Sequence, residues 1–329
     1  MKALALFSGG LDSLLAMKLI KEQGIEVKAI YFDIGFDSKS SKKDELERRA
    51  KSVGADFMVL DVKKQFFDDI LFKPKYGYGK HFNPCIDCHA NMFRQAFSRL
   101  KELNASFLIS GEVLGQRPKS QRAEALKQVE KLSGAEGLIL RPLSAKLLEP
   151  STPESKGWVD REMLEAIEGR SRVRQLELAS KFKLDDLPSP AGGCLLTEES
   201  VSDRIEDIRN SAGFSVEEIP LVKCGRYFIL PEGARLVVGR DFEDNQSLQK
   251  TKSKNFSPIL QEGLVGPYSF LQNSASKNDL ELASKIVLAY SKGVKKQEEY
   301  SVCFQEQIVT TSPLQNKEEA REFLIHNKG

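Results

Sequence analysis

The first stretch of the chain whose residue types could do chemistry is Ser8-Gly9-Gly10-Leu11-Asp12-Ser13. It follows an apolar run at residues 3–7, which predicts a strand, and precedes an amphipathic stretch at 14–23, which predicts a helix. A glycine turn that opens a helix presents unpaired backbone N–H groups, and the helix dipole favours negative charge there. The segment is therefore a candidate anion cradle. Its spacing matches neither G-x-x-x-x-G-K-[ST] nor G-x-G-x-x-G.

Three cysteines form a second group that could do chemistry. Cys85 and Cys88 stand at C-x-x-C spacing, and Cys194 follows Gly192-Gly193, where missing side chains leave the sulfur unobstructed. Two thiols at this spacing can share a metal, a cluster or a redox bond. Three thiolates leave one iron of a 4Fe-4S cluster without a protein ligand, and such an iron can hold an extra sulfide. Alternatively, His89 could complete a four-ligand zinc site.

The elements between these residues predict how they are positioned. Strand patterns alternate with helical patterns, as at 44–53 and 122–131, so we expect an α/β fold with a doubly wound parallel sheet. The further expected strands lie at residues 27–32, 57–62, 107–109 and 138–140. Ligands of such sheets bind at the carboxyl ends of the strands.

Composition limits the class of protein. The 329 residues are 40% hydrophobic and 29% charged, which suits a globular chain of two domains. The net charge of +2 means that a nucleic acid would have to meet local basic surface. No signal peptide and no apolar run of about 18 residues is evident, so we expect a cytoplasmic protein without a membrane partner. Five cysteines then favour metal or thiol chemistry over a disulfide framework, with Cys224 and Cys303 as core thiols.

A second, small α+β domain is expected at residues 216–329, after a first domain at 1–215. Strand patterns at 219–230 and 234–238 flank the turn Pro231-Glu232-Gly233. The stretch V-G-R-D-F-E-D-N at 238–245 resembles the V-G-R-N-x-x-x-N signature of the RNA-binding domain of NFACT-type proteins, although aspartate stands where that family usually has asparagine. Its arginines are candidate phosphate contacts, notably Arg226, Arg235 and Arg240. The lysine- and aromatic-rich segment 66–82 suits either a mobile loop that stacks on nucleic acid or a solvated surface loop.

The motifs of the first domain carry a further resemblance. The loop at 8–13 resembles the S-G-G-x-D-S pyrophosphate loop (PP-loop) of ATP pyrophosphatases with the adenine nucleotide alpha hydrolase-like fold. With residues 110–116, Ser120-Gln121 and 140–143, it is similar to the pyrophosphatase domain of tRNA 4-thiouridine synthetases. The frame N-P-x-x-x-C at 83–88 resembles the tRNA 2-thiouridylases. Their first catalytic cysteine occupies the Cys88 position, and their second resembles Cys194.

The resemblance implies a tRNA sulfurtransferase that adenylates a uridine carbonyl with ATP and Mg²⁺ and replaces the oxygen with sulfur. Asp12, Cys88 and Cys194 would then be the catalytic residues, with Asp12 organising the metal. The implied ATP-binding residues are Ser8, Gly9, Gly10, Asp12, Ser13, Phe32, Asp33, Gly111 and Gln116.

Cys85 stands where the 2-thiouridylases usually have aspartate, which resembles the cluster-dependent members of this superfamily. This implies a 4Fe-4S cluster on Cys85, Cys88 and Cys194, with zinc, or persulfide chemistry without a metal, as the alternatives. The amino-terminal tRNA-binding domain and the rhodanese domain of bacterial 4-thiouridine synthetases are not expected here. The implied partners are tRNA and a sulfur donor, either sulfide or a cysteine desulfurase.

Two other functions remain open at this point. The first is a non-thiolating ATP pyrophosphatase that amidates or ligates an adenylated acid, which would not need three thiols. The second is a tRNA-binding protein with a relic ATP site, against which the intact Asp12 and Ser13 argue. The sequence leaves open which uridine is modified and how many copies of the chain assemble.

Overall fold

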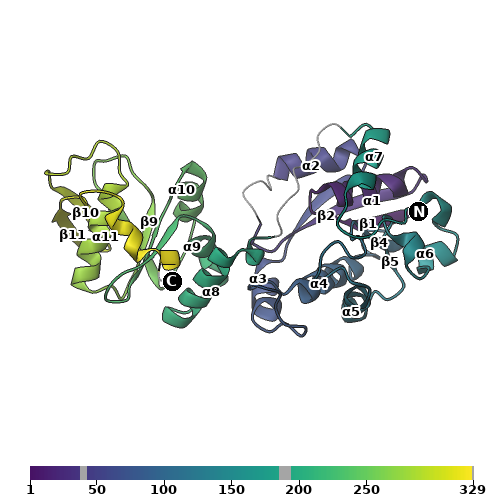
Figure 1. Ribbon diagram of the computed structural model, residues 1–329, viewed down its shortest axis with the longest axis horizontal. Helices are drawn as coiled ribbons and strands as arrows, with labels where there is room; N and C mark the ends of the chain where they lie inside the picture. The colour runs from purple at the N-terminus through teal and green to yellow at the C-terminus, as the bar shows by residue number, and fades with distance from the viewer. Residues whose placement is uncertain (38–42, 185–193, 328–329) are drawn as a thin grey trace. The chain divides into compact units, whose positions relative to one another are not determined.

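The computed structural model describes residues 1–37, 43–184 and 194–327. The chain forms two compact units, Met1–Cys194 and Leu195–Gly329 (Figure 1). The strands of the first unit are β1 (Lys2–Leu6), β2 (Glu26–Asp33), β3 (Asp56–Asp61), β4 (Phe107–Ser110) and β5 (Ile139–Leu140). Its α-helices are α1 (Leu11–Lys21), α2 (Lys43–Ser52), α3 (Lys63–Phe66), α4 (Cys85–Phe97), α5 (Ala123–Ser133), α6 (Thr152–Ser155) and α7 (Val173–Lys181). The pair Gly192-Gly193, expected to expose Cys194, lies outside the described residues.

The five strands of the first unit form one parallel sheet in the order β3-β2-β1-β4-β5. The chain starts at the central strand, moves outward to β3, and then crosses to the other side through β4. This confirms the expected α/β fold with a doubly wound parallel sheet. The order reverses beside β1, and at such a point the carboxyl ends of the strands leave a crevice for a ligand.

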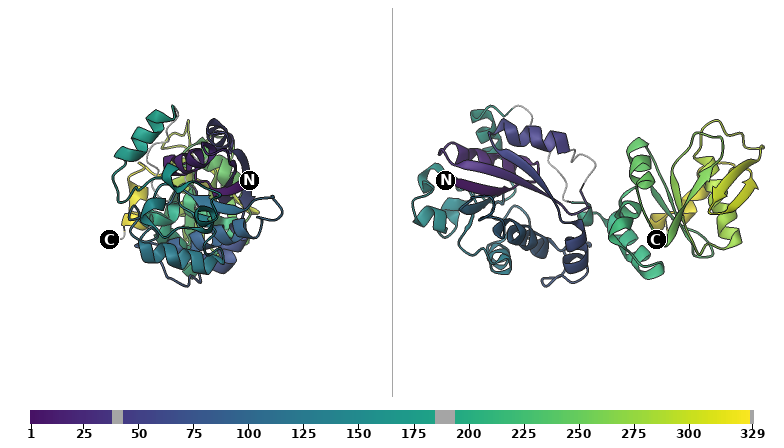
Figure 2. Two further views of the ribbon diagram at one scale, coloured as in Figure 1. Left: turned by 90° about the vertical axis from the view of Figure 1, so that its right-hand side faces the viewer. Right: turned by 180° about the vertical axis from the view of Figure 1, so that it is seen from behind.

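Helices cover both faces of this sheet, as the two opposite views show (Figures 1 and 2). Leu14 and Met17 of α1 and Leu46 of α2 share one buried cluster with Ala3 and Ala5 of β1. Helix α7 packs on the outer side of α1. Helices α4 and α5 lie against each other on the opposite face. The small side chains of β1 let the helices approach the sheet closely, which fixes where the turn after β1 lies.

The second unit is an antiparallel sheet with helices, which confirms the expected α+β class. Its strands are β6 (Arg226–Ile229), β7 (Arg235–Val238), β8 (Phe256–Gln261), β9 (Ser269–Gln272), β10 (Tyr300–Phe304) and β11 (Gln307–Thr311), and its α-helices are α8 (Glu199–Ser211), α9 (Ile219–Lys223), α10 (Phe242–Gln249) and α11 (Lys277–Ala289). The strand order is β11-β10-β8-β9-β7-β6. Leu280, Ile286 and Val287 of α11 fill the core over one face of this sheet. No helix in the described part of the chain is long and apolar enough to cross a membrane.

The single strand expected at 219–230 is wrong, because its first half is the helix α9. Ser215 and Glu218 form a reciprocal capping box, and Pro220 stands in the first turn, where its missing N–H costs nothing. Gly225 then turns the chain at φ +72°, and a Cβ at this position would lie 2.6 Å from the carbonyl oxygen of Val238. Strand β6 therefore begins only at Arg226.

Helix α8 packs with the second unit, and the compact units divide at Cys194, before the 215/216 boundary expected from the sequence. Asp207 of α8 accepts two hydrogen bonds from Arg235 of β7, at 2.8 and 3.0 Å, and one from the Tyr227 hydroxyl at 2.8 Å. Arg204 of α8 donates to the carbonyls of Cys224 and Gly225. The assignment of separate activities to residues 1–215 and 216–329 stays a proposal.

Candidate active site

The turn after β1 forms the expected cradle at the start of α1. Gly9 adopts φ +79°, and Gly10 is the N-cap residue in an extended conformation. The hydroxyl of Ser13 donates to the Gly10 carbonyl at 2.8 Å, and the Ser8 hydroxyl lies 3.5 Å from that of Ser13. No side chain among the described residues caps the helix, so the first N–H groups of α1 keep their capacity to bind an anion.

Asp12 faces Gln116, another of the residues implied by the resemblance. Gln116 Nε2 donates to Asp12 Oδ2 at 3.1 Å. Asp12 Oδ1 and Gln116 Oε1 are both buried acceptors without a hydrogen-bond donor. Two such oxygens beside an anion cradle suit a hard cation such as Mg²⁺, whose ligands are oxygens. The donor set therefore fits the metal that the resemblance implies.

Gly111 is required by the close approach of β4 to the cradle. A Cβ at this position would lie 2.4 Å from the backbone nitrogen of Ser13 and 2.5 Å from the carbonyl carbon of Asp12. Both contacts are to backbone, which cannot rotate away, so only glycine fits. The end of β4 thus lies directly against the first turn of α1.

The expected adenosine-binding residues at the end of β2 are both engaged within the protein. The Phe32 side chain is buried in the core and leaves only backbone for a ligand. Asp33 accepts a hydrogen bond from the Gly35 N–H at 2.9 Å and pairs with Lys63 at 2.7 Å. Burial lowers the pKa of Lys63, but its hydrogen bonds to Asp33 and Asp61 outweigh burial and hold the pKa above the ordinary value.

Cys85 and Cys88 lie in the first turn of α4. Asn83 donates from its side-chain nitrogen to the Cys85 sulfur at 3.1 Å, and Cys85 is half-buried. Cys88 is only 8% exposed. Burial raises the pKa of the Cys88 thiol well above its ordinary value, and the neighbouring charges of Cys194 and Cys85 raise it further. Cys85 and Cys88 therefore share the first turn of α4, and the charge of Cys194 acts on Cys88 from nearby.

The segment expected as a mobile or solvated loop is packed onto this helix. The carboxylate of Asp87, which is 3% exposed, accepts the backbone N–H groups of Lys75 and Tyr76 at 2.7 and 3.0 Å. The rings of Tyr78 and Phe82 lie 4.6 Å apart, so these aromatic side chains contact each other. Asp87 thus has a structural role between the two cysteines of the C-x-x-C motif.

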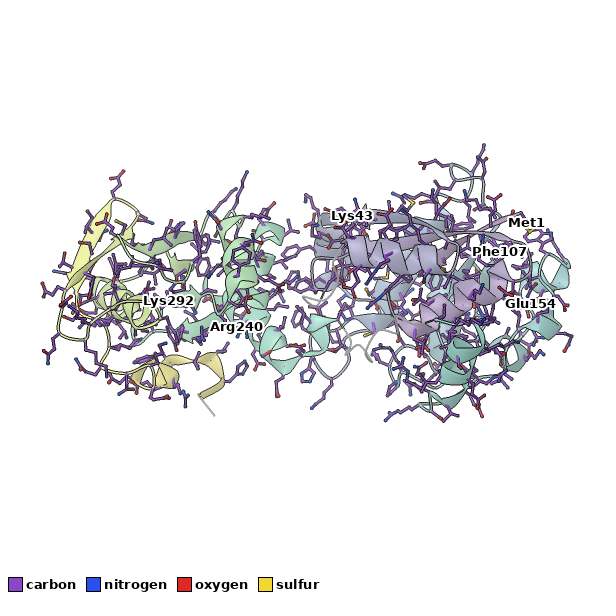
Figure 3. The ribbon with its side chains drawn as sticks, turned by 90° about the horizontal axis from the view of Figure 1, so that it is seen from above. Met1, Lys43, Phe107, Glu154, Arg240 and Lys292 are labelled. Atoms are coloured by element: carbon purple, nitrogen blue, oxygen red, sulfur yellow. The ribbon has the colours of Figure 1, made fainter. Side chains whose placement is uncertain are left out.

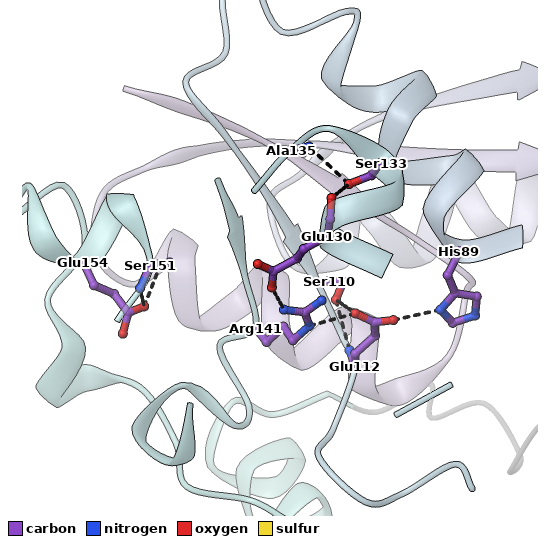
Figure 4. A network of polar contacts seen from close by, with 9 residues as sticks. All are labelled: His89, Ser110, Glu112, Glu130, Ser133, Ala135, Arg141, Ser151 and Glu154. Atoms are coloured by element: carbon purple, nitrogen blue, oxygen red, sulfur yellow. Dashed lines mark hydrogen bonds and ion pairs between the residues drawn. The ribbon is translucent and has the colours of Figure 1, made fainter. Parts of the chain in front are cut away.

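A buried network links the cysteine helix to the end of β4 (Figure 4). His89 Nδ1 lies 2.8 Å from Glu112 Oε1, and Arg141 Nε donates to Glu112 Oε2 at 2.9 Å. Arg141 also pairs with Glu130 of α5, and Ser110 donates to Glu112 at 3.2 Å. Burial raises the pKa of Glu112, but Arg141 and His89 outweigh it and hold the pKa at about 2. Because an ionised carboxylate only accepts, His89 carries its proton on Nδ1.

This network joins the two halves of the candidate site, and sequence reasoning missed it. Gly111 lies against the cradle, and the next residue, Glu112, contacts His89. His89 in turn directly follows Cys88 in the chain. The cradle and the cysteines are therefore tied to the same edge of the sheet. An available signal was the position of two ionisable residues just after buried strands: Arg141 directly follows β5, and Glu112 stands two residues after the end of β4.

The arrangement does not fit the iron–sulfur cluster or the zinc site that the cysteines suggested. In the described ranges, no three Cys, His, Asp or Glu side chains lie where they could hold one metal ion. No chemical step is therefore derived through a cluster or a zinc ion.

The three arginines expected to contact phosphate are engaged within the second unit. Arg235 forms the ion pair with Asp207, and Arg240 pairs with the buried Asp244 at 3.0 Å. The guanidinium of Arg226 lies over the ring of Tyr290, 4.4 Å from its centre. Arg240, labelled in Figure 3, keeps 44% of its side chain exposed and stays available for an RNA contact.

Comparison with known proteins matches each unit to a domain family. Residues 1–150 match the family described as the tRNA methyl transferase HUP domain, and residues 225–324 match the NFACT protein RNA binding domain. A tRNA-specific 2-thiouridylase MnmA 2 of Clostridium botulinum is 34% identical over 113 residues, covering 32% of this chain and 32% of that protein. The tRNA-specific 2-thiouridylase MnmA of Shouchella clausii is 26% identical over 213 residues, covering 60% and 54%.

Among solved structures, a 4-thiouridine synthetase in complex with RNA and ATP aligns at 20% identity, with a TM-score of 0.38 and coverage of 67% of this chain and 52% of that one. The matches to the curated relatives span about a third to a half of those proteins. Residues 1–150 are therefore similar to a HUP domain, on the parallel sheet, and residues 225–324 are similar to an NFACT-type RNA-binding domain.

Proposed function

We propose that the protein is an ATP-dependent tRNA sulfurtransferase, which adenylates a uridine carbonyl oxygen and replaces that oxygen with sulfur. The observation that carries the proposal is the tie between the anion cradle and the cysteine helix α4, made through Gly111, Glu112 and His89. A non-thiolating ATP pyrophosphatase does not need the three thiols of this chain. The relatives named as 2-thiouridylases support the same chemistry.

Activation of the uridine is assigned to the cradle. A carbonyl oxygen is a poor leaving group. Adenylation attaches AMP to this oxygen and releases pyrophosphate, so the oxygen can later leave as part of AMP. The N–H groups at the start of α1 and the hydroxyls of Ser8 and Ser13 would hold the phosphates. Asp12 and Gln116 would hold Mg²⁺, which neutralises charge on the departing pyrophosphate when bound. Backbone at Phe32 and Asp33 would meet the adenosine.

Sulfur transfer is assigned to Cys88 and Cys194. The donor for this route is the persulfide of a cysteine desulfurase: the Cys88 thiolate attacks its outer sulfur, the desulfurase cysteine leaves as a thiolate, and Cys88 then carries the persulfide. The outer sulfur attacks the activated uridine carbon, the carbon–oxygen bond breaks, and AMP leaves with the electron pair. The Cys194 thiolate then attacks the inner sulfur, which forms a Cys88–Cys194 disulfide and frees the thiouridine. A thiol reductant returns both cysteines to the reduced state.

The role of Cys85 decides between this route and a cluster. If Cys85, Cys88 and Cys194 ligate 4Fe-4S, alanine at any one of them removes iron and thiolation together while adenylation persists. In the persulfide route, Cys85→Ala is tolerated, and neither air nor iron chelation changes activity. The described geometry lacks a three-donor metal group and favours the persulfide route. Brown colour and stoichiometric iron in anaerobically purified protein would reverse this choice.

The second unit would bind the tRNA, and the protein would then work in the cytoplasm, where its substrate is. The decisive experiment is mass spectrometry of tRNA nucleosides from cells that lack the gene, complemented with variants. Wild type is expected to restore one thiouridine and Asp12→Ala to restore none. Asp56→Ala, an exposed aspartate at the opposite edge of the sheet, is the control and should restore it. Thiouridine content that does not depend on the gene would refute thiolation.

A further inference from the structure

The second unit contains a small pocket beside the V-G-R-D-F-E-D-N stretch. The pocket has a volume of about 260 Å³ and lies between α10, the end of β8 and the segment that leads into β9. Its lining residues are Phe242, Asn245, Gln246, Gln249, Leu260, Gln261, Gly266, Pro267 and Tyr268. Pockets for drug-sized ligands measure roughly 300–1,000 Å³. This pocket is below that range and suits one planar ring system.

The lining combines aromatic rings with amides, which are the two groups that bind a nucleobase. Phe242 is 74% exposed at the start of α10, although a large apolar side chain normally avoids water. Tyr268 supplies a second ring. Aromatic faces stack on unpaired bases, and amide side chains pair with base edges through one acceptor and two donors.

One buried acceptor in this pocket has no donor. Gln261 Oε1 is inaccessible to solvent and makes no hydrogen bond, although most buried polar atoms in proteins are paired. The amide oxygen of Asn245 is held by the Tyr268 N–H at 3.0 Å, which fixes that side chain at the pocket wall. Gly266 makes room for the Gln261 amide, since a Cβ there would lie 2.6 Å from Gln261 Nε2. Gln261 lines the pocket, and rotation of its amide would bring this unsatisfied oxygen to an amino or imino group on a base edge.

Exposed lysines lie next to the elements that form the pocket. Lys250, Lys252 and Lys254 follow α10 directly, and all three are exposed. Lys292, labelled in Figure 3, is exposed as well, and its backbone N–H donates to the Val265 carbonyl at 2.7 Å, in the loop beside Gly266. Exposed lysines on the segments that adjoin these elements can attract the phosphate backbone of a bound RNA strand.

We propose that this pocket binds one unpaired nucleobase of an RNA strand, stacked on Phe242 and read by Gln261. The proposal rests on the RNA-binding part of the proposed function and does not depend on the thiolation chemistry. It gives the second unit a preference for single-stranded or looped RNA over a fully paired helix, because only an unpaired base can enter the pocket.

The test measures binding of the full chain to fluorescein-labelled hexanucleotides of adenosine, cytidine and uridine, without ATP. A hexamer of abasic ribose phosphates serves as the probe that keeps the charge and lacks the bases. Phe242→Ala should weaken binding of the best base-containing hexamer by about five- to 150-fold, the range for losing one stacked base. It should leave both the abasic hexamer and the dependence on salt unchanged, because phenylalanine carries no charge.

Ile308→Ala is the matched control, since Ile308 is 64% exposed on β11 and lies outside this pocket. It should bind every probe as the wild type does. Gln261→Leu should bring the affinities for the three bases closer together. If wild type binds no RNA, the RNA-binding part of the proposed function fails and the pocket proposal with it. If wild type binds and Phe242→Ala binds equally well, or loses the abasic probe equally, only the pocket proposal fails.

Discussion

Replacing Glu112 by glutamine tests whether the buried network holds the candidate site together. The substitution keeps the size of the side chain and removes its charge. Arg141, whose side chain is 3% exposed, then loses one of its two carboxylate partners, and the single amide oxygen of glutamine can accept from Arg141 or from His89 but not at both former positions. Removal of one partner from a buried ion pair typically costs roughly 3–5 kcal/mol.

The pKa of Glu112 gives an independent magnitude and a pH dependence. The Glu112 carboxyl has a pKa of about 2 in the folded state and an ordinary value of 4.5, which we take for the unfolded chain. This difference stabilises the folded state by about 3 kcal/mol at pH 7. Because the folded-state pKa is the lower one, this contribution is complete above the unfolded pKa and is lost as the pH falls toward 2. It should be about 2 kcal/mol at pH 3.5.

The assay is urea unfolding followed by tryptophan fluorescence. Trp158 is the only tryptophan of the chain and packs against the core of the first unit, so its signal reports that unit alone. Glu162→Gln is the control, because its side chain is 87% exposed and should change stability by less than about 0.5 kcal/mol. A Glu112→Gln cost below about 1 kcal/mol at pH 7, or one that does not shrink between pH 7 and 3.5, would refute the reasoning.

Three further predictions follow from the geometry. Gly111→Ala should lower ATP–pyrophosphate exchange by about 100-fold, because its Cβ displaces the cradle backbone; unchanged exchange would contradict the close approach. In iodoacetamide labelling followed by mass spectrometry at pH 7, Cys88 should react more slowly than Cys85, because it is buried with a raised pKa. Equal rates would be inconsistent with this environment. Arg235→Ala should cost the second unit roughly 2 kcal/mol in thermal unfolding, because it leaves Asp207 without its bidentate partner, whereas an exposed Lys252→Ala should not.

Sequence patterns predicted the first unit well because its signals are local. Each of its strands is a short apolar run, and the cradle motif marks the junction of β1 and α1. The prediction of a single strand at 219–230 was wrong because it relied on the hydrophobic residues and gave too little weight to the local signals that start and end a helix. The capping pair Ser215 and Glu218, then Pro220 and Gly225, mark a short helix and a turn.

The buried network could not be predicted in the same way. Glu112 meets His89 across 23 residues and Arg141 across 29, so the contacts exist only once β4, β5 and α4 have assembled. The contacts of the three arginines in the second unit were also hard to predict from the sequence. Their charge is visible in the sequence, but the distant partners Asp207 of Arg235 and Tyr290 of Arg226 are not; only Asp244, four residues after Arg240, was a local signal.

The burial of Cys88 also bears on how the protein survives oxidants. Oxidation to sulfenic and then sulfinic acid proceeds through the exposed thiolate, and the sulfinic step is irreversible for most cysteines. A thiol that is 8% exposed and has a raised pKa offers neither exposure nor thiolate. Peroxide should therefore reach the half-buried Cys85 first. Cys88, on which sulfur transfer would depend, is therefore protected from oxidation as a buried thiol until a bound substrate changes its surroundings.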